Sequence, residues 1–268
     1  MSIDQDRKEM INAPTEEWRC IRLRFSGFTQ DQDNWASKAT RWWSDVAGNV
    51  DLALDRRDSA KGLVEMAGEI RPDQVLELTV RRGRIDWQLN TVVPVEVELP
   101  AKGKLPERLP DLGPFNDALQ EFVQQVRKWL VSLPSNPYFH RLAFATDSKI
   151  DEGAAGGLKV LEAAVGIDLS RLADAKDVEV AFNHPVTSKA VETIKINKIR
   201  RLKLEKVVIT ARGPGRKVLA SKEYNFIANS TDFNTQPSAE TLVKGEQRAL
   251  LFDELVSLTL NSLNTVGG

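Results

Sequence analysis

Two periodic segments come first along the chain. From Trp18 to Phe28 apolar and polar residues alternate, which predicts a strand covered on one face. In the next segment apolar residues recur at steps of four, three and four, which predicts a helix with one buried stripe: Trp35, Ala39, Trp42 and Val46. Trp43 lies about 100° from the edge of this stripe, and we expect it to widen the core face rather than to anchor a partner.

A β-hairpin is the clearest local prediction. Two alternating segments, Val75–Arg81 and Arg84–Asn90, flank Arg82 and Gly83. A two-residue turn at these positions places the apolar residues of both strands on one face. The resulting cross-strand pairs are Val80 and Ile85, Leu78 and Trp87, and Leu76 and Leu89. Arginine is unusual at the first turn position, so a longer turn shifted by one residue stays open.

The remaining elements follow from the same patterns of period, proline and glycine. In chain order we expect an exposed connector at Pro94–Pro114, a helix over Phe115–Leu130, a strand over Phe139–Ile150, a helix from Leu158, a strand over Val178–Phe182, strands between Ile194 and Ala228 with a turn at Gly213–Gly215, and a helix near Val243–Leu263.

The order strand, helix, antiparallel strands, helix therefore occurs twice. It predicts an α+β fold of two analogous halves, whose antiparallel sheets are each covered by helices. We expect a mobile tail over residues 1–14, an N-terminal half over 15–134 and a C-terminal half over 135–268. The pattern leaves open whether the halves share one sheet.

Composition places the chain among soluble globular proteins. Of its 268 residues, 41% are hydrophobic and 28% are charged, which argues against general disorder. Cys20 is the only cysteine, so no disulfide forms within the chain. The first residues lack the apolar core of a secretion signal, and no apolar run reaches the ~18 residues of a membrane helix. We therefore expect a cytoplasmic protein.

Most catalytic chemistries lack their residues in this chain. His140 and His184 are the only histidines, which excludes structural zinc, and the Gly-x-Ser-x-Gly motif of serine hydrolases is absent. His184 lies at the end of one expected strand, where a histidine more often occupies a turn than acts as a base, and His140, at the start of another, is not expected to be catalytic either. The glycines of Gly153–Gly157 lack the lysine and hydroxyl spacing of a phosphate-binding loop. We expect no catalytic residue, metal or cofactor.

Carboxylates provide the alternative function. Asp51, Asp55 and Asp58, or Asp31 and Asp33, have a chemistry that suits a divalent metal. Together with His184 such a cluster would make the chain a cryptic metal-dependent hydrolase or nuclease. A metal site requires residues that converge from distant segments, and charged runs are usually solvated surface.

The charge distribution gives the main functional prediction. The net charge is −1, but residues 189–222 hold eleven basic and two acidic residues, a local charge of +9 that leaves −10 for the rest. Where apolar residues of these strands point into the core, the basic residues between them point outward. The candidate binding residues are Lys195, Lys203, Lys206, Arg212, Arg216 and Lys217.

This basic segment predicts a non-enzymatic binding or assembly module. Its partner is a nucleic acid or other polyanion bound without sequence preference, or an acidic protein, and the sequence leaves these two undecided. No aromatic residue is interleaved with the cations to stack on bases, so sequence-specific recognition is not expected. Solvated lysines that protect strand edges are the structural alternative.

The order of elements also resembles a known family. The elements concerned are the Val75–Asn90 hairpin, the Phe115–Leu130 helix, the Tyr138–Ile150 strand, the Glu223–Thr235 strand and the Glu246–Leu263 helix, together with the phrase Gly83-Arg84-Ile85-Asp86-Trp87. They resemble a sporadically distributed, uncharacterised bacterial α+β family. The resemblance brings no catalytic motif, and it implies a bacterial accessory protein of a mobile or defence-related gene set.

Overall fold

The structure is a computed structural model. It describes residues 18–29, 35–92, 96–98, 105–134, 139–151, 158, 161–162, 166, 168–169, 171, 178–212, 218–237 and 242–264. The strands are β1 (Arg19–Thr29), β2 (Leu54–Asp58), β3 (Leu63–Arg71), β4 (Gln74–Arg81), β5 (Arg84–Thr91), β6 (Glu96–Glu98), β7 (Phe139–Asp151), β8 (Glu179–Asn183), β9 (Val186–Thr187), β10 (Lys195–Arg212) and β11 (Val218–Thr235). The helices are the 3-10 turn η2 (Trp35–Lys38), α2 (Ala39–Ala47), α3 (Phe115–Ser132) and α5 (Gly245–Asn264).

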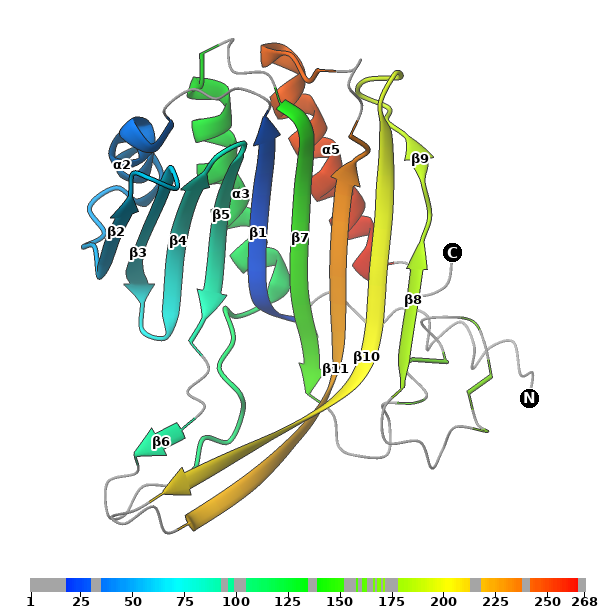
Figure 1. Cartoon of the computed structure of the whole chain (residues 1–268). Coiled ribbons are helices and arrows are strands. Elements are labelled where there is room, and N and C mark those ends of the chain that lie inside the picture. The colour runs from blue at the N-terminus through cyan, green and yellow to red at the C-terminus, as the bar shows by residue number, and fades with distance from the viewer. Residues whose placement is uncertain are drawn as a thin grey trace.

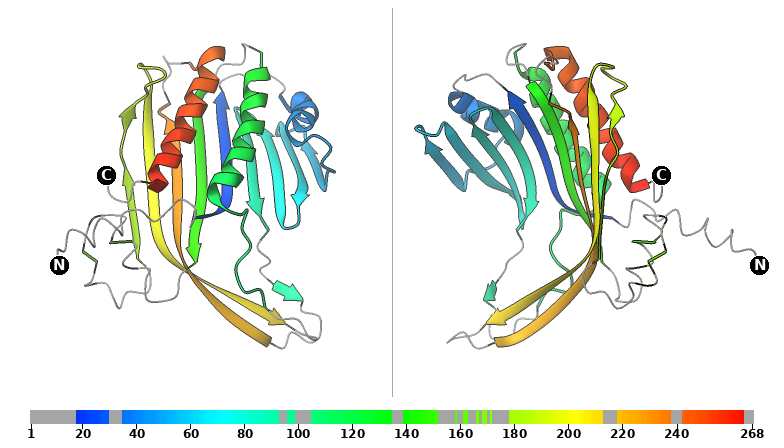
Figure 2. Two further views of the ribbon diagram at one scale, coloured as in Figure 1. Left: turned by 180° about the vertical axis from the view of Figure 1, so that it is seen from behind. Right: turned by 45° about the vertical axis from the view of Figure 1, so that its right-hand side comes forward.

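All eleven of these strands form one sheet (Figure 1). Their order is β2-β3-β4-β5-β1-β7-β11-β10-β6, and β8 and β9 also pair with β10. The pairs are antiparallel except for β6, which lies parallel to β10. Helices α2, α3 and α5 lie on one face of this sheet (Figure 2).

The expected fold of two analogous halves, each a strand, a helix, antiparallel strands and a helix, is therefore wrong. β1 pairs with β5 along one edge and with β7 along the other, so strands from both parts of the sequence continue into each other. The period of a strand shows which residues are buried, but it does not show which strand lies beside it. The repeated order of elements was consequently no guide to a boundary between sheets.

The hairpin and the first helix predicted in the N-terminal part are confirmed, whereas the connector that was predicted to be exposed buries Leu109 and Leu112. β4 and β5 pair in the expected register, with Leu78 opposite Trp87 across a turn at Arg82 and Gly83. Gly83 has φ 70°, a left-handed conformation that glycine adopts without strain. The helix of the predicted Trp35 stripe is also present, and Trp43 is buried beside it.

Aromatic rings join the helices to the sheet. Trp87 of β5 stacks on Trp43 of α2 with ring centroids 6.2 Å apart and meets the edge of Trp129 of α3 at 5.8 Å. Phe25 of β1 lies in turn against Trp129 and against Phe252 of α5. Such aromatic contacts add to the large apolar area that these side chains bury.

Polar contacts fix the helices against each other. Arg248 of α5 donates hydrogen bonds to the carbonyl oxygens of Leu133 and Pro134, which follow the end of α3. Arg127 of α3 forms an ion pair with Asp253 of α5 at 2.8 Å. Carbonyls at a helix C-terminus lack partners within the helix, so Arg248 supplies the donors that they need.

The sheet is curved, and the helices cover its convex side (Figure 2). Beyond the end of β7, β10 and β11 continue as a two-stranded ribbon that bends toward the concave side. A small separate core holds the connector against this ribbon: Leu109, Ile209, Tyr224 and Phe226. The hydroxyl of Tyr224 donates to the carbonyl oxygen of Pro106 at 2.5 Å.

Among the described helices, none is long and apolar enough to span a membrane. The predicted tail over residues 1–14, the turn at Gly213–Gly215 and the loop at Gly153–Gly157 lie outside the described residues.

Truncation of Trp87 tests this core. Trp87 is 0% exposed and contacts tryptophans from two helices, so Trp87→Ala should lower the free energy of unfolding by ~3 to 5 kcal/mol. Urea unfolding followed by circular dichroism measures this change. Leu250→Ala, at a side chain that is 52% exposed, should change stability by less than about 0.5 kcal/mol. An unchanged melting temperature for Trp87→Ala would contradict the observed packing.

Candidate functional site

The concave face of the sheet, opposite the helices, is the candidate site. On β1, Leu23 and Phe25 are buried on the helix side, and the alternate residues therefore lie on the concave face. The register continues this face across the neighbouring strands. Its central positions on β5, β1, β7 and β11 are Arg84, Asp86, Gln88, Asn90, Arg22, Arg24, Ser26, Phe28, Arg141, Ala143, Ala145, Asp147, Ser230, Asp232 and Asn234.

An arginine cluster surrounds Phe28 on this face. The guanidinium carbon of Arg84, on β5, lies 4.9 Å from the centre of the Phe28 ring, and that of Arg141, on β7, lies 5.0 Å from it. Arg84 and Arg81 both form ion pairs with Asp86, at 2.8 and 3.3 Å. The ring therefore accepts cation–π contacts from both flanking strands.

Two arginines of the concave face have no acceptor for their buried N–H groups. The Nε atoms of Arg24 and Arg141 are buried and form no hydrogen bond, and neither residue has an ion pair with a described residue. Burial of a donor without an acceptor costs free energy. The Nε atoms themselves are closed off from solvent, so an anion would meet the terminal NH2 groups of Arg24 and Arg141, whose charge no ion pair with a described residue offsets.

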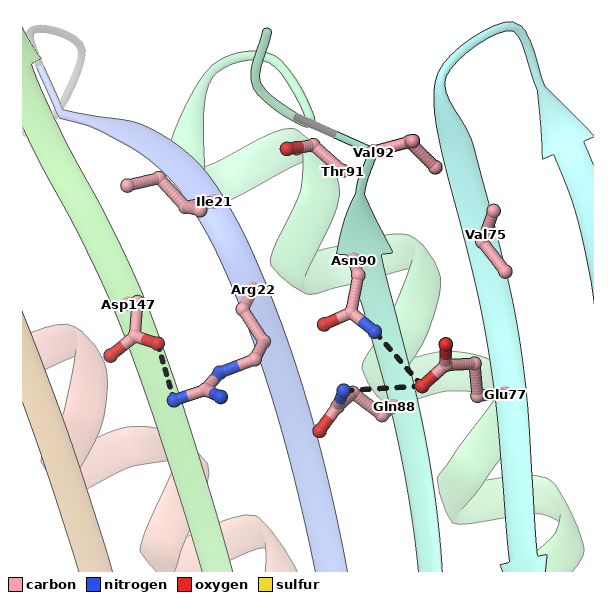
Figure 3. Close-up of a pocket in the computed structure, with 9 residues that line it drawn as sticks. All are labelled: Ile21, Arg22, Val75, Glu77, Gln88, Asn90, Thr91, Val92 and Asp147. Carbon is pink, nitrogen blue, oxygen red and sulfur yellow. Dashed lines mark hydrogen bonds and ion pairs between the residues drawn. The ribbon is translucent and has the colours of Figure 1, made fainter. Parts of the chain in front are cut away.

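A depression of about 400 Å³ lies on the same face toward the start of β1 (Figure 3). Arg22 and Asp147 form an ion pair across its β1–β7 side at 2.5 Å. On its other side Gln88 and Asn90 both donate hydrogen bonds to Oε2 of Glu77, at 3.2 and 3.0 Å. Burial raises the pKa of Glu77, and these two hydrogen bonds partly offset the rise.

The predicted basic residues do not all lie on one surface. Lys203 lies on the concave face and forms an ion pair with Glu205 at 3.3 Å. Lys206 lies three positions further along β10, on the opposite side of the ribbon, and pairs with Glu223 at 2.6 Å. Register places the exposed Lys195 on the concave side.

The other three predicted residues are near the tip of the ribbon. Arg212 is the last residue of β10, and its side chain lies outside the described part. Arg216 and Lys217 fall outside the described residues altogether. Arg201, which the prediction did not single out, is exposed on the same concave face as Lys203.

The histidines and carboxylates show no catalytic convergence within the described residues. His184 is exposed, and its backbone N–H donates to the carbonyl oxygen of Lys198. Burial lowers the pKa of His140, with a smaller contribution from the neighbouring charge of Arg141. Asp55 pairs with Arg57.

The other carboxylates that were considered as metal ligands are Asp58, Asp31 and Asp33. Asp58 pairs with Lys61, and the residues that the structure describes contain no group of three His, Cys, Asp or Glu side chains that could hold a metal. Asp31 and Asp33 lie outside those residues.

Sequence reasoning missed the arginine cluster because its members come from different strands. The alternation of Arg22, Arg24 and Ser26 showed that β1 has a polar face. The cluster itself requires that β5 and β7 flank β1, so that Arg84 and Arg141 meet Phe28. Hydrophobic period alone does not contain this information.

Comparisons with known proteins give no family. No protein-family model matches the chain, and no curated protein matches it. Three chains of solved structure match. One is the di-domain ARO/CYC StfQ from the steffimycin biosynthetic pathway, with 7% sequence identity over 91% of this chain and 97% of that chain. Its TM-score of 0.16 is too low to carry an argument about fold or function.

The pH dependence of stability tests the Glu77 environment. Since the pKa of Glu77 is raised in the folded protein, the folded state binds its proton more tightly than the unfolded state does, and stability falls as pH rises from about 4.3 through the raised pKa. Glu77→Gln removes this loss and keeps an acceptor for Gln88 and Asn90. We expect the variant to gain stability relative to the wild type between pH 4 and pH 7 in urea unfolding. Parallel pH profiles would contradict this account.

Proposed function

We propose that this chain is a non-catalytic binding module that contacts a polyanion through the concave face of its sheet. The observation that carries the proposal is a pair of arginines that have no ion pair with a described residue, Arg24 and Arg141, on a sheet face that the helices leave uncovered. Residues of the basic segment extend the same face: Lys195, Arg201 and Lys203.

The chemistry of the face favours phosphate over carboxylate partners. Arginine presents a planar fork of donors that matches phosphate oxygens, and an extended row of cations suits a ligand with regularly repeated charges. Arg24 and Arg141 lie on the neighbouring strands β1 and β7, and Arg201 lies on β10, which β11 separates from β7 on the same face. An acidic protein remains the alternative partner, and the binding assay below distinguishes the two.

A catalytic role has less support. General acid–base or metal chemistry needs several titratable groups that converge in a cavity. In the depression, the charge of Asp147 is paired with Arg22, and Glu77 is held by two amides. We further propose a cytoplasmic location and a bacterial accessory role, as the composition and the family resemblance imply.

The salt dependence of binding tests the proposed function. A fluorescein-labelled single-stranded oligothymidylate of twenty nucleotides serves as the probe, and anisotropy measures its association constant. Four or five phosphate contacts predict that log K falls with log salt with a slope of about −3 to −3.5 for a single strand. Failure of the wild-type protein to bind this probe or inorganic polyphosphate at low salt, with retention of an acidic protein, would favour the alternative partner.

Substitutions of Lys203 and Lys206 form a matched pair that tests which side of the ribbon binds the ligand. Both are ion-paired lysines of β10, and they lie on opposite sides of the ribbon. Lys203→Gln should make the salt slope shallower by about 0.7, because one phosphate contact is lost. Lys206→Gln should leave the slope unchanged. Equal effects of the two substitutions would mean that the concave face is not the binding surface.

A further inference from the structure

We infer that Arg24 and Arg141 form an anchoring site for two separate phosphate groups of an extended chain, which lies along β1 and β7. This inference rests on the proposed function and names the site that would hold the ligand. It assigns the strongest contact to residues outside the basic segment 189–222.

The pairing of β1 with β7 defines the shape of the site. Arg24 faces Ala145, Ser26 faces Ala143, and Phe28 faces Arg141. The two arginines therefore lie at diagonal corners of a patch on β1 and β7. They are four residues apart along the strands and one strand apart across them. At ~3.4 Å per residue and ~4.8 Å between strands, their Cα atoms are roughly 14 Å apart.

The floor between the arginines consists of short side chains. Ser26, Ala143 and Ala145 are the concave-face residues between the two corners. The hydroxyl of Ser26 is engaged, because it donates to Asp86 at 2.5 Å. These three residues are only 2%, 5% and 7% exposed, so longer neighbouring side chains cover most of the floor. A chain that follows the strands passes over these side chains and finds a guanidinium at each end.

Contacts with Phe28 orient one of the two anchors. Arg141 lies against the ring at 5.0 Å, which limits how far its guanidinium swings toward Arg24. The two side chains therefore hold separate anionic groups, and a ligand with a repeated charge satisfies both. A side chain already held in place loses less entropy when it binds.

The neighbouring charges set the direction of the bound chain. On the β5 side, Arg81 and Arg84 share the single carboxylate of Asp86, so this side keeps an excess positive charge. On the β11 side, Asp232 lies next to Ala145 and accepts a hydrogen bond from Asn234. Its negative charge opposes phosphate beside Ala145, so between Arg24 and Phe28 the chain follows β1, and it meets the cations of β10 only beyond this stretch.

The test replaces each anchor by a neutral residue of similar shape. Arg24→Gln and Arg141→Gln should each weaken binding of the oligothymidylate roughly five- to tenfold at low salt. Each should also make the salt slope shallower by about 0.7, and the double variant by about 1.4. Arg24→Lys and Arg141→Lys keep the charge and lose the planar fork, so they should keep the salt slope and lose only part of the affinity.

Controls separate a lost contact from a lost fold. Arg56→Gln removes an arginine of β2 that is already paired with Glu65, and it should leave both affinity and slope unchanged. Thermal unfolding of every variant shows whether the sheet is intact. If a glutamine variant unfolds, the corresponding lysine variant replaces it in the test, and the measured quantity is then its loss of affinity. Inorganic polyphosphate should displace the oligothymidylate, because the two chains share their phosphate groups.

The possible results decide the inference separately from the proposed function. Wild-type binding with a salt slope near −3, together with unchanged slopes in both glutamine variants, would overturn the inference and leave the proposed function standing. Polyphosphate that fails to displace the oligothymidylate would also overturn it, since phosphate groups alone would then not fill the site. If the wild-type protein binds neither the oligothymidylate nor polyphosphate, both the inference and the proposed function are wrong.

Discussion

The pairing of β1 on both of its edges is the constraint on which the rest of the structure depends. β1 is the first strand in the sequence, yet it lies between β5 and β7 in the middle of the sheet. Its two faces therefore serve two purposes at once. Phe25 packs against Trp129 and Phe252 on the helix side, while Arg24, its neighbour in sequence, lies on the concave side. A slip of one residue in this register would exchange these two side chains.

The placement of α2, α3 and α5 on one side leaves the other side uncovered by these helices. An antiparallel sheet is stable with one face covered and one face solvated, provided that the solvated face is polar. Here the solvated face is mostly arginine, carboxylate and amide, and its curvature brings residues of distant strands toward one another. The ribbon of β10 and β11 continues beyond the helices, and there the connector around Leu109 packs on its concave side through a small core of its own.

Sequence patterns predicted those features that depend on residues close together in the chain. The register of β4 and β5 follows from a two-residue turn and from side chains such as Val80 and Ile85 that match across it. The union of the two parts of the chain depends instead on the contact of β1 with β7, whose paired residues lie more than a hundred positions apart. Periodicity is the same for a central strand and an edge strand, so no local signal distinguishes the single sheet from two.

The candidate site shows why local charge in a sequence differs from a charged surface. The segment 189–222 has the largest excess of basic residues, but Lys203 and Lys206 are offset by glutamates and point to opposite sides. Arg24 and Arg141 come from less basic parts of the chain, and they keep unpartnered buried N–H groups. An anion gains more from cations that no carboxylate neutralises, such as Arg24 and Arg141, than from the net count of charges in a segment. Because each strand contributes only one such arginine, the site exists only in the assembled sheet, and the pairing of β1 with β7 is what creates it.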